Sequence, residues 1–119
     1  MSAEIMIRRR SRQIPLTLTT TTATAITLQM GDFSGGVIDI GTIATAATTL
    51  QMWGSSTEGG TFRRLYDSAG AVADITLAPS TAVGTIYALP DAVFGVPYLE
   101  VLVGNTAGTG VAATVTLKS

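Results

Sequence analysis

The chain has 119 residues, a length that suits one domain with a substantial buried core. It contains no Cys and no His, which excludes a disulfide scaffold, an ordinary zinc site and the usual Ser–His or Cys–His nucleophile pairs. Charged residues make up only 13% of the chain, about half the usual share, and the net charge is −1.

The first thirteen residues differ in charge from the rest of the chain. Their basic residues are Arg8, Arg9, Arg10 and Arg12. With Glu4 as their one acid they carry +3, whereas the remaining residues hold three basic and seven acidic side chains, a charge of −4. Because apolar alternation begins only at Ile14, we expect residues 1–13 to form an extended basic N-terminal arm and residues 14–119 to form the domain.

The four arginines of the arm are the candidate partner-binding residues. Arginine makes bidentate hydrogen bonds with carboxylates, which suits an acidic protein surface. The same cluster would also release counterions from a nucleic acid, but no aromatic residue is interleaved with it and the acidic domain would repel a phosphate backbone. A solvated tail is a third interpretation. The pattern favours a protein partner and argues against nucleic acid.

Period-two alternation runs through most of residues 14–119, and helical periodicity is nearly absent. The β-branched residues Thr, Val and Ile dominate these stretches, and they fit a half-buried, pleated surface. The pattern predicts about eight strands among nine candidate segments: 16–18, 26–30, 38–40, 49–53, 61–66, 75–77, 85–89, 98–103 and 111–118.

Turn-forming residues separate these segments. Residues 55–60 and 104–110 predict hairpin loops, and 67–70 predict a type I turn with Asp first and Gly last. Residues 90–95 predict one helical turn, since Pro suits an early helical position and Gly95 can end it. Short strands with short connections predict an all-β fold, an antiparallel, jelly-roll-like β-sandwich with under about 10% helix.

The sequence offers no catalytic or metal-binding constellation. Without His or Cys a carboxylate pair is the remaining ordinary catalyst, and the acidic residues are scattered singly at predicted turns or outward strand positions. A calcium loop of alternating Asp residues and a glycine-rich phosphate loop followed by Lys and a helix are both missing. We therefore expect no enzymatic activity, no metal and no cofactor.

The chain also lacks the usual signals for a membrane or for secretion. No run of about 18 apolar residues occurs, so no membrane partner is expected. The basic N-terminus is followed by a Thr-rich stretch instead of an apolar signal core.

Four aromatic residues are candidates for a sugar-stacking platform: Trp53, Tyr66, Tyr87 and Tyr98. Residues of this kind more often pack in the core or on a sheet face, so packing is the favoured interpretation.

Aromatic residues and glycines recur together from Leu50 onward. The segments are Trp53-Gly54-Ser55, Gly59-Gly60-Thr61-Phe62, Leu65-Tyr66-Asp67 with Gly70, Tyr87-x-Leu89-Pro90 with Phe94, and Leu99-x-Val101. Over residues 50–119 this arrangement resembles small β-sandwich virion proteins of tailed bacteriophages, in particular the capsid decoration, or cement, proteins. Proteins of that family bind the outside of the shell at junctions between major capsid subunits and stabilise it, often with an extended N-terminal arm.

The resemblance implies a structural virion protein on the capsid exterior, made in the host cytoplasm. Its partner would be the major capsid protein, with self-association as a dimer or trimer on the shell. The charge-poor composition agrees with this, because a surface that neighbours cover needs little charge for solubility. Two alternatives stay open: another virion component of the tail, neck or baseplate, and a carbohydrate-binding or adhesive β-sandwich module.

Overall fold

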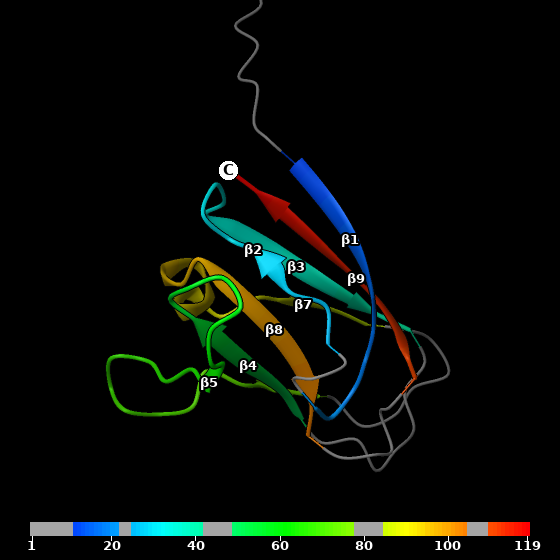
Figure 1. Ribbon diagram of the computed structural model, residues 1–119. Helices are drawn as coiled ribbons and strands as arrows, with labels where there is room; N and C mark the ends of the chain where they lie inside the picture. The colour runs from blue at the N-terminus through cyan, green and yellow to red at the C-terminus, as the bar shows by residue number, and fades with distance from the viewer. Residues whose placement is uncertain (1–10, 22–24, 42–48, 78–84, 105–109) are drawn as a thin grey trace, which may run out of the picture.

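The computed structural model describes residues 11–21, 25–41, 49–77, 85–104 and 110–119. These residues form nine strands in two antiparallel sheets (Figure 1). Sheet A has the order β1-β9-β3-β7 and comprises β1 (Ser11–Thr17), β9 (Ala112–Lys118), β3 (Gly35–Ile40) and β7 (Thr85–Ala88). Sheet B has the order β2-β8-β4-β5 and comprises β2 (Leu28–Gln29), β8 (Tyr98–Val103), β4 (Thr49–Ser55) and β5 (Arg63–Arg64), with β6 (Ile75–Thr76) also paired to β4. The predicted all-β antiparallel sandwich is confirmed.

The strand pairs are nested, like those of one long hairpin that has been rolled up. β1 pairs with β9, β2 with β8, β3 with β7 and β4 with β5. Rolling then brings β9 beside β3 and β8 beside β4, which completes each sheet. This is the strand order of a jelly roll, with β6 as an addition along the edge of β4.

The inward faces of the two sheets form one apolar core. In β9, for example, Ala113, Val115 and Leu117 are buried, and the residues between them face outward. Each fully buried aliphatic side chain contributes about 1.5–3 kcal/mol relative to an exposed one, so a core of this kind stabilises the sandwich without disulfides or metals. The largest fully buried side chains are Leu18, Leu28, Met30, Ile38, Ile40, Leu50, Met52, Val93, Leu99, Val103, Val115 and Leu117.

The first strand begins earlier than the alternation predicts. Ser11 pairs with Lys118, Arg12 with Leu117, and Gln13 with Thr116, so residues 11–13 belong to sheet A and not to the arm. Polar side chains near the exposed end of an edge strand leave no apolar pattern, although the backbone pairs there as it does at Ile14. The predicted boundary at residue 13 therefore falls inside β1. Residues 1–10, with Arg8, Arg9 and Arg10, lie outside the described residues.

Two of the predicted local structures are confirmed. The N–H of Gly70 donates to the carbonyl of Asp67 at 3.0 Å, as in the predicted turn, and the Asp67 Oδ1 accepts from the N–H groups of Ala69 and Ala71. The predicted helical turn is the 3-10 helix η1 (Asp91–Gly95), which follows Pro90.

The two predicted hairpin loops have different outcomes. Residues 55–60 join β4 to β5, which pair with each other as expected. Residues 104–110 join β8 in sheet B to β9 in sheet A, so the chain crosses between the sheets there and the hairpin prediction was wrong. Turn residues show where a chain reverses, but they do not show which strand it then pairs with.

Gly36 in β3 lies too close to β9 to carry a side chain. A Cβ at Gly36 would lie 2.6 Å from the carbonyl oxygen of Thr116, whereas a Cβ at Gly35 would meet nothing within 4 Å. We expect Gly36→Ala to lower the free energy of unfolding by about 1–3 kcal/mol. The matched control Gly35→Ala should change it by less than about 1 kcal/mol in either direction. Urea denaturation measures both, and equal stability of the two variants would contradict the close β3–β9 contact.

Candidate partner-binding site

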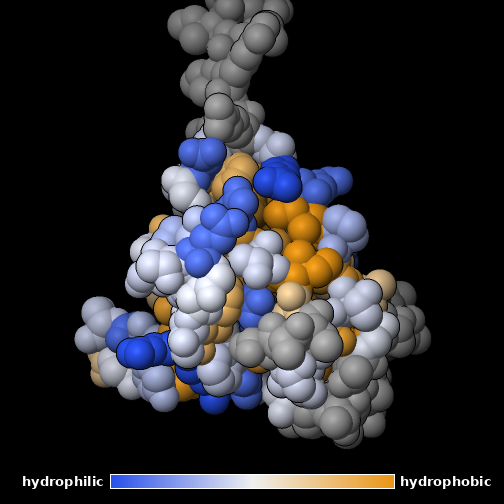
Figure 2. Space-filling model, in the orientation of Figure 1, coloured by the Kyte–Doolittle hydropathy of each residue, from blue (hydrophilic) through white to orange (hydrophobic). Residues whose placement is uncertain are grey.

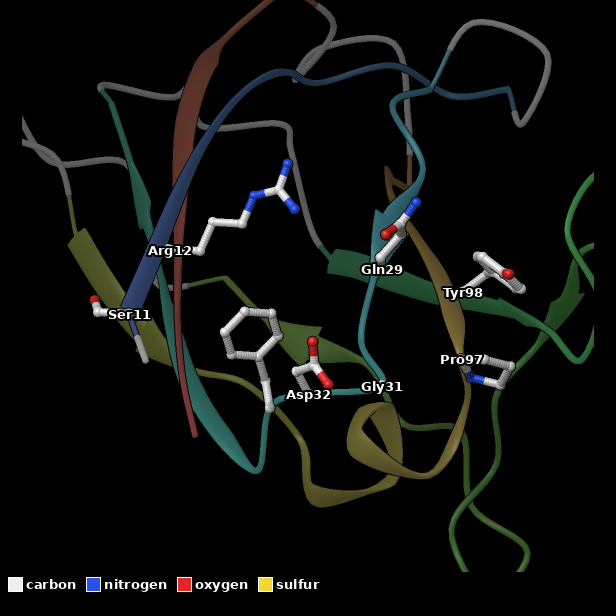
Figure 3. A pocket seen from close by; sticks show the side chains of 8 residues that line it. Ser11, Arg12, Gln29, Gly31, Asp32, Pro97 and Tyr98 are labelled. Atoms are coloured by element: carbon white, nitrogen blue, oxygen red, sulfur yellow. The ribbon is translucent and has the colours of Figure 1, made fainter. Parts of the chain in front are cut away.

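A groove of about 490 Å³ lies between the edge strands β1 and β2, on an open side of the sandwich (Figure 3). Figure 2, in the orientation of Figure 1, shows hydrophobic surface in this opening beneath strongly hydrophilic side chains. The groove is lined by the start of β1, by β2 with the loop after it, and by the start of β8. Its residues are Ser11, Arg12, Gln29, Gly31, Asp32, Phe33, Pro97 and Tyr98.

Arg12 reaches the groove because of its position in the alternation of β1. Its pairing with Leu117 puts it on the inward side of the strand, in line with Ile14 and Leu16, which pack in the core. Arg12 lies at the end of this series, beyond the apolar side chains, and is exposed. Its guanidinium points into the opening toward Gln29 on β2 (Figure 3).

The loop opposite Arg12 is held by backbone hydrogen bonds. The Met30 N–H donates to the Pro97 carbonyl at 2.9 Å, the Phe33 N–H to the Met30 carbonyl at 3.1 Å, and the Ser34 N–H to the Lys118 carbonyl at 3.0 Å. These bonds tie the loop to both sheets. The Asp32 carboxylate points toward the groove from it (Figure 3).

Arg12 is available to a partner. In the part of the chain that the structure describes, it makes no ion pair and no side-chain hydrogen bond. A guanidinium binds a carboxylate or phosphate through two parallel hydrogen bonds. Gln29 of β2 and Tyr98 of β8 line the other side of the groove, and the Tyr98 ring points away from Arg12 (Figure 3). The groove thus suits an acidic group carried on a segment that also makes apolar contacts.

A second feature is a row of polar and aromatic side chains across the outer face of sheet B. Trp53 in β4 pairs with Arg64 in β5 and with Glu100 in β8. The Thr27 hydroxyl donates to the Glu100 Oε2 at 3.1 Å, and the Arg64 guanidinium pairs with the Asp74 carboxylate. The row therefore runs from Arg64 through Trp53 and Glu100 to Thr27.

Glu100 is the unusual member of this row, because it is only 3% exposed. Its Oε1 has no hydrogen-bond partner among the described residues. Burial raises the pKa of Glu100, and the hydrogen bond from Thr27 offsets part of that rise. Burying an ionised carboxylate with one unpartnered oxygen is costly, so the fold opposes the deprotonation of Glu100.

The four aromatic residues considered as a sugar platform do not share one face. Tyr87 packs against the core, and Tyr66 is 58% exposed beside the 67–70 turn. Trp53 and Tyr98 lie on the outer side of sheet B, in the adjacent strands β4 and β8. The structure therefore assembles no four-residue platform.

Of the arginines predicted to bind a partner, Arg12 is the one that the structure places in the groove. Gln29 and Asp32 were not predicted, and Tyr98 was considered only for sugar stacking, because only the pairing of β1 with β9 and of β2 with β8 brings these residues near Arg12. Glu100 was not predicted either, since alternation places it on an outward face where acids are normally exposed.

Within the described ranges, no three His, Cys, Asp or Glu side chains gather into a possible metal site. The same residues contain no helix with the length and apolarity to cross a membrane. No family model matches the chain, and neither a curated protein nor a solved structure shows significant similarity to it. Function is therefore inferred from the groove and the surfaces of the sandwich.

The buried Glu100 predicts a pH-dependent stability. The pKa of Glu100 is higher in the folded protein than its ordinary value of 4.5. At a pH between these two pKa values, the unfolded chain has released the Glu100 proton and the folded protein still holds it. Stability should therefore fall as pH rises through that window. We expect Glu100→Gln to raise the Tm at neutral pH and to lose this advantage below pH 4.5.

Thermal unfolding followed by circular dichroism on both sides of that window measures this effect. Glu58→Gln removes an exposed acid in the β4–β5 loop and is the matched control, which should leave the Tm unchanged. A Glu100→Gln variant that is less stable than the natural protein at neutral pH would show instead that the ionised carboxylate stabilises the fold.

Proposed function

We propose that this protein is a structural virion protein that binds the outer surface of a bacteriophage capsid and stabilises the shell. The observation that carries the proposal is the groove between β1 and β2, in which Arg12 has no partner among the described residues. Arg8, Arg9 and Arg10 precede Arg12 in the sequence, and in this proposal they bind acidic groups of the same partner.

Three further features support the proposal. Residues 50–119 resemble the decoration proteins of tailed bacteriophages in their aromatic and glycine segments. The composition is poor in charge and contains neither His nor Cys, as suits a binding protein that neighbours cover. The jelly-roll sandwich provides a rigid body that holds the groove in place. Because copies repeat over a symmetric shell, modest individual contacts add up to a strong brace.

The partner in this proposal is the major capsid protein, at junctions between its subunits, and the location is the capsid exterior. Nucleic acid fits less well, because residues 14–119 carry a charge of −4 and would repel it. The carbohydrate-binding alternative receives less support from a sandwich that separates Tyr66 and Tyr87 from Trp53 and Tyr98. Copy number per particle distinguishes a shell protein from a tail, neck or baseplate component, whose copies are few.

Charge reversal at Arg12 tests the proposal. We expect Arg12→Glu to weaken binding to undecorated shells at least about tenfold, because a like charge would then face the partner's acidic group. Arg63→Glu makes the same charge change at an exposed position of β5 and is the matched control. Binding of the natural protein should weaken with salt, since exposed charges are screened over about 8 Å at physiological ionic strength.

Cosedimentation of the full chain with shells across a salt series measures these effects. A chain without residues 1–10 keeps all of β1, so it should fold normally and bind more weakly. Equal occupancy by Arg12→Glu and Arg63→Glu at every salt concentration would contradict the groove as the binding site. Binding that depends on packaged nucleic acid, and not on the shell protein, would favour the nucleic-acid alternative.

A further inference from the structure

The outer face of sheet A, formed by the outward side chains of β1, β9, β3 and β7, is poor in charge. Its residues are Ser, Gln, Pro, Thr, Ala, Gly, Val and Ile, with Asp39 and Lys118 as the two exceptions. Two large hydrophobic side chains are exposed there, Val37 at 37% and Ile86 at 62%. A face with so little charge and with exposed apolar side chains is a candidate interaction surface.

The two charges on this face are placed symmetrically about its centre. Lys118 in β9 pairs with Gly35, Asp39 in β3 pairs with Thr114, and the pair of Val37 with Thr116 lies midway between them. Each charge is therefore about 7 Å along the strands from the central pair, on opposite sides of it. Neither makes an ion pair with any other residue that the structure describes.

This arrangement is self-complementary. Consider a two-fold axis that lies in the plane of contact, runs roughly across the strands and passes between Val37 and Thr116. Rotation about this axis brings Lys118 of one copy opposite Asp39 of the other copy. The reciprocal pair forms at the same time, as in any isologous interface. Two copies that meet in this way form two ion pairs around a centre of Val and Thr side chains.

The same axis also brings the apolar Ile86 side chain of one copy opposite a second groove, on the outer face of sheet A of the other copy. Ile86 pairs with Asp39 in the neighbouring strand, so the axis carries it close to the other copy's Lys118 and Gly35. This second groove, of about 380 Å³, lies there and is lined by Ser34, Gly35, Gly36, Val37, Thr116, Lys118 and Ser119. A Cβ at Gly35 would have open space around it, so Ile86 of a second copy fits where this face has no side chain of its own.

From these observations we propose that the outer face of sheet A binds the same face of a second copy of this chain as a two-fold dimer. Four strands about 4.8 Å apart and seven residues of about 3.3 Å each give a face of roughly 20 by 20 Å. That area is at the small end of specific interfaces, so the dimer is a weak one that forms at high protein concentration or at high local concentration.

The dimer does not rest on the virion proposal, and the two can fail separately. Arg12 lies on the inward side of β1 and takes no part in the outer face of sheet A. The test of the dimer uses the protein alone, without shells.

Sedimentation equilibrium of the full chain from about 10 μM to about 1 mM tests the dimer. The mass should rise from 12.2 kDa toward twice that value. Ile86→Lys, Asp39→Lys and Lys118→Asp should each raise the dimer dissociation constant at least about tenfold, because each puts a desolvated or like charge at the contact. The combined variant Asp39→Lys with Lys118→Asp restores opposite charges and should return within about threefold of the natural protein.

Ile26→Lys is the control, since Ile26 is 48% exposed and lies outside sheet A, and it should leave the dissociation constant unchanged. Circular dichroism confirms that each variant is folded. A monomer at every concentration would overturn the proposal. So would a dimer that tolerates Ile86→Lys, or one in which the combined charge reversal binds no better than the single ones, because the copies would then meet through other residues.

Discussion

The pairing of β1 with β9 is the constraint on which both the sandwich and the groove depend. β9 lies between β1 and β3 in sheet A, and its inward residues Ala113, Val115 and Leu117 are buried. The pairing joins opposite ends of the chain, from Ser11 with Lys118 to Thr17 with Ala112. Closing so long a loop costs conformational entropy, which the burial of the inward side chains of β9 offsets. The same register holds Arg12 at the end of the apolar series and thereby at the groove.

Three outer surfaces of the sandwich differ in charge and in exposed side chains, and each suits a different kind of contact. The open side between β1 and β2 presents Arg12, which has no partner among the residues that the structure describes, beside a hydrogen-bonded loop, and this suits an acidic partner. The outer face of sheet A is poor in charge, and its two charges are placed symmetrically, which suits a second copy of the chain. The outer face of sheet B is largely occupied by its own row of side chains, with Glu100 buried in it. In a two-fold dimer through sheet A, two copies of the groove would be presented together. Two linked sites bind a repetitive surface more tightly than one does.

Alternation along the chain was sufficient to predict the strands, because each inward face of a sandwich needs apolar side chains at every second position. It was strongest in β8 and β9, and Pro90 with Gly95 marked the short helix correctly. Alternation did not indicate which strands pair with each other. Residues 104–110 have the composition of a turn, but they connect strands of different sheets. It also missed residues 11–13, whose backbone pairs without an apolar pattern.

At the candidate site, charge clustering singled out Arg12, whereas Gln29 and Asp32 join it only through long-range pairing. The burial of Glu100 and Leu102 on an outward face depends on tertiary packing that no local pattern records.

In the proposed function, a partner binds in the groove between β1 and β2. Hydrogen–deuterium exchange of the full chain, free and bound to undecorated shells, tests this most directly because it locates the contact without altering any residue. Binding should slow exchange in residues 11–17, in residues 28–34 and around Pro97 and Tyr98, whereas the turns within residues 55–72 should exchange as they do in the free protein. Slower exchange confined to residues 55–72, with no change along β1 and the loop after β2, would show that the partner binds elsewhere on the sandwich.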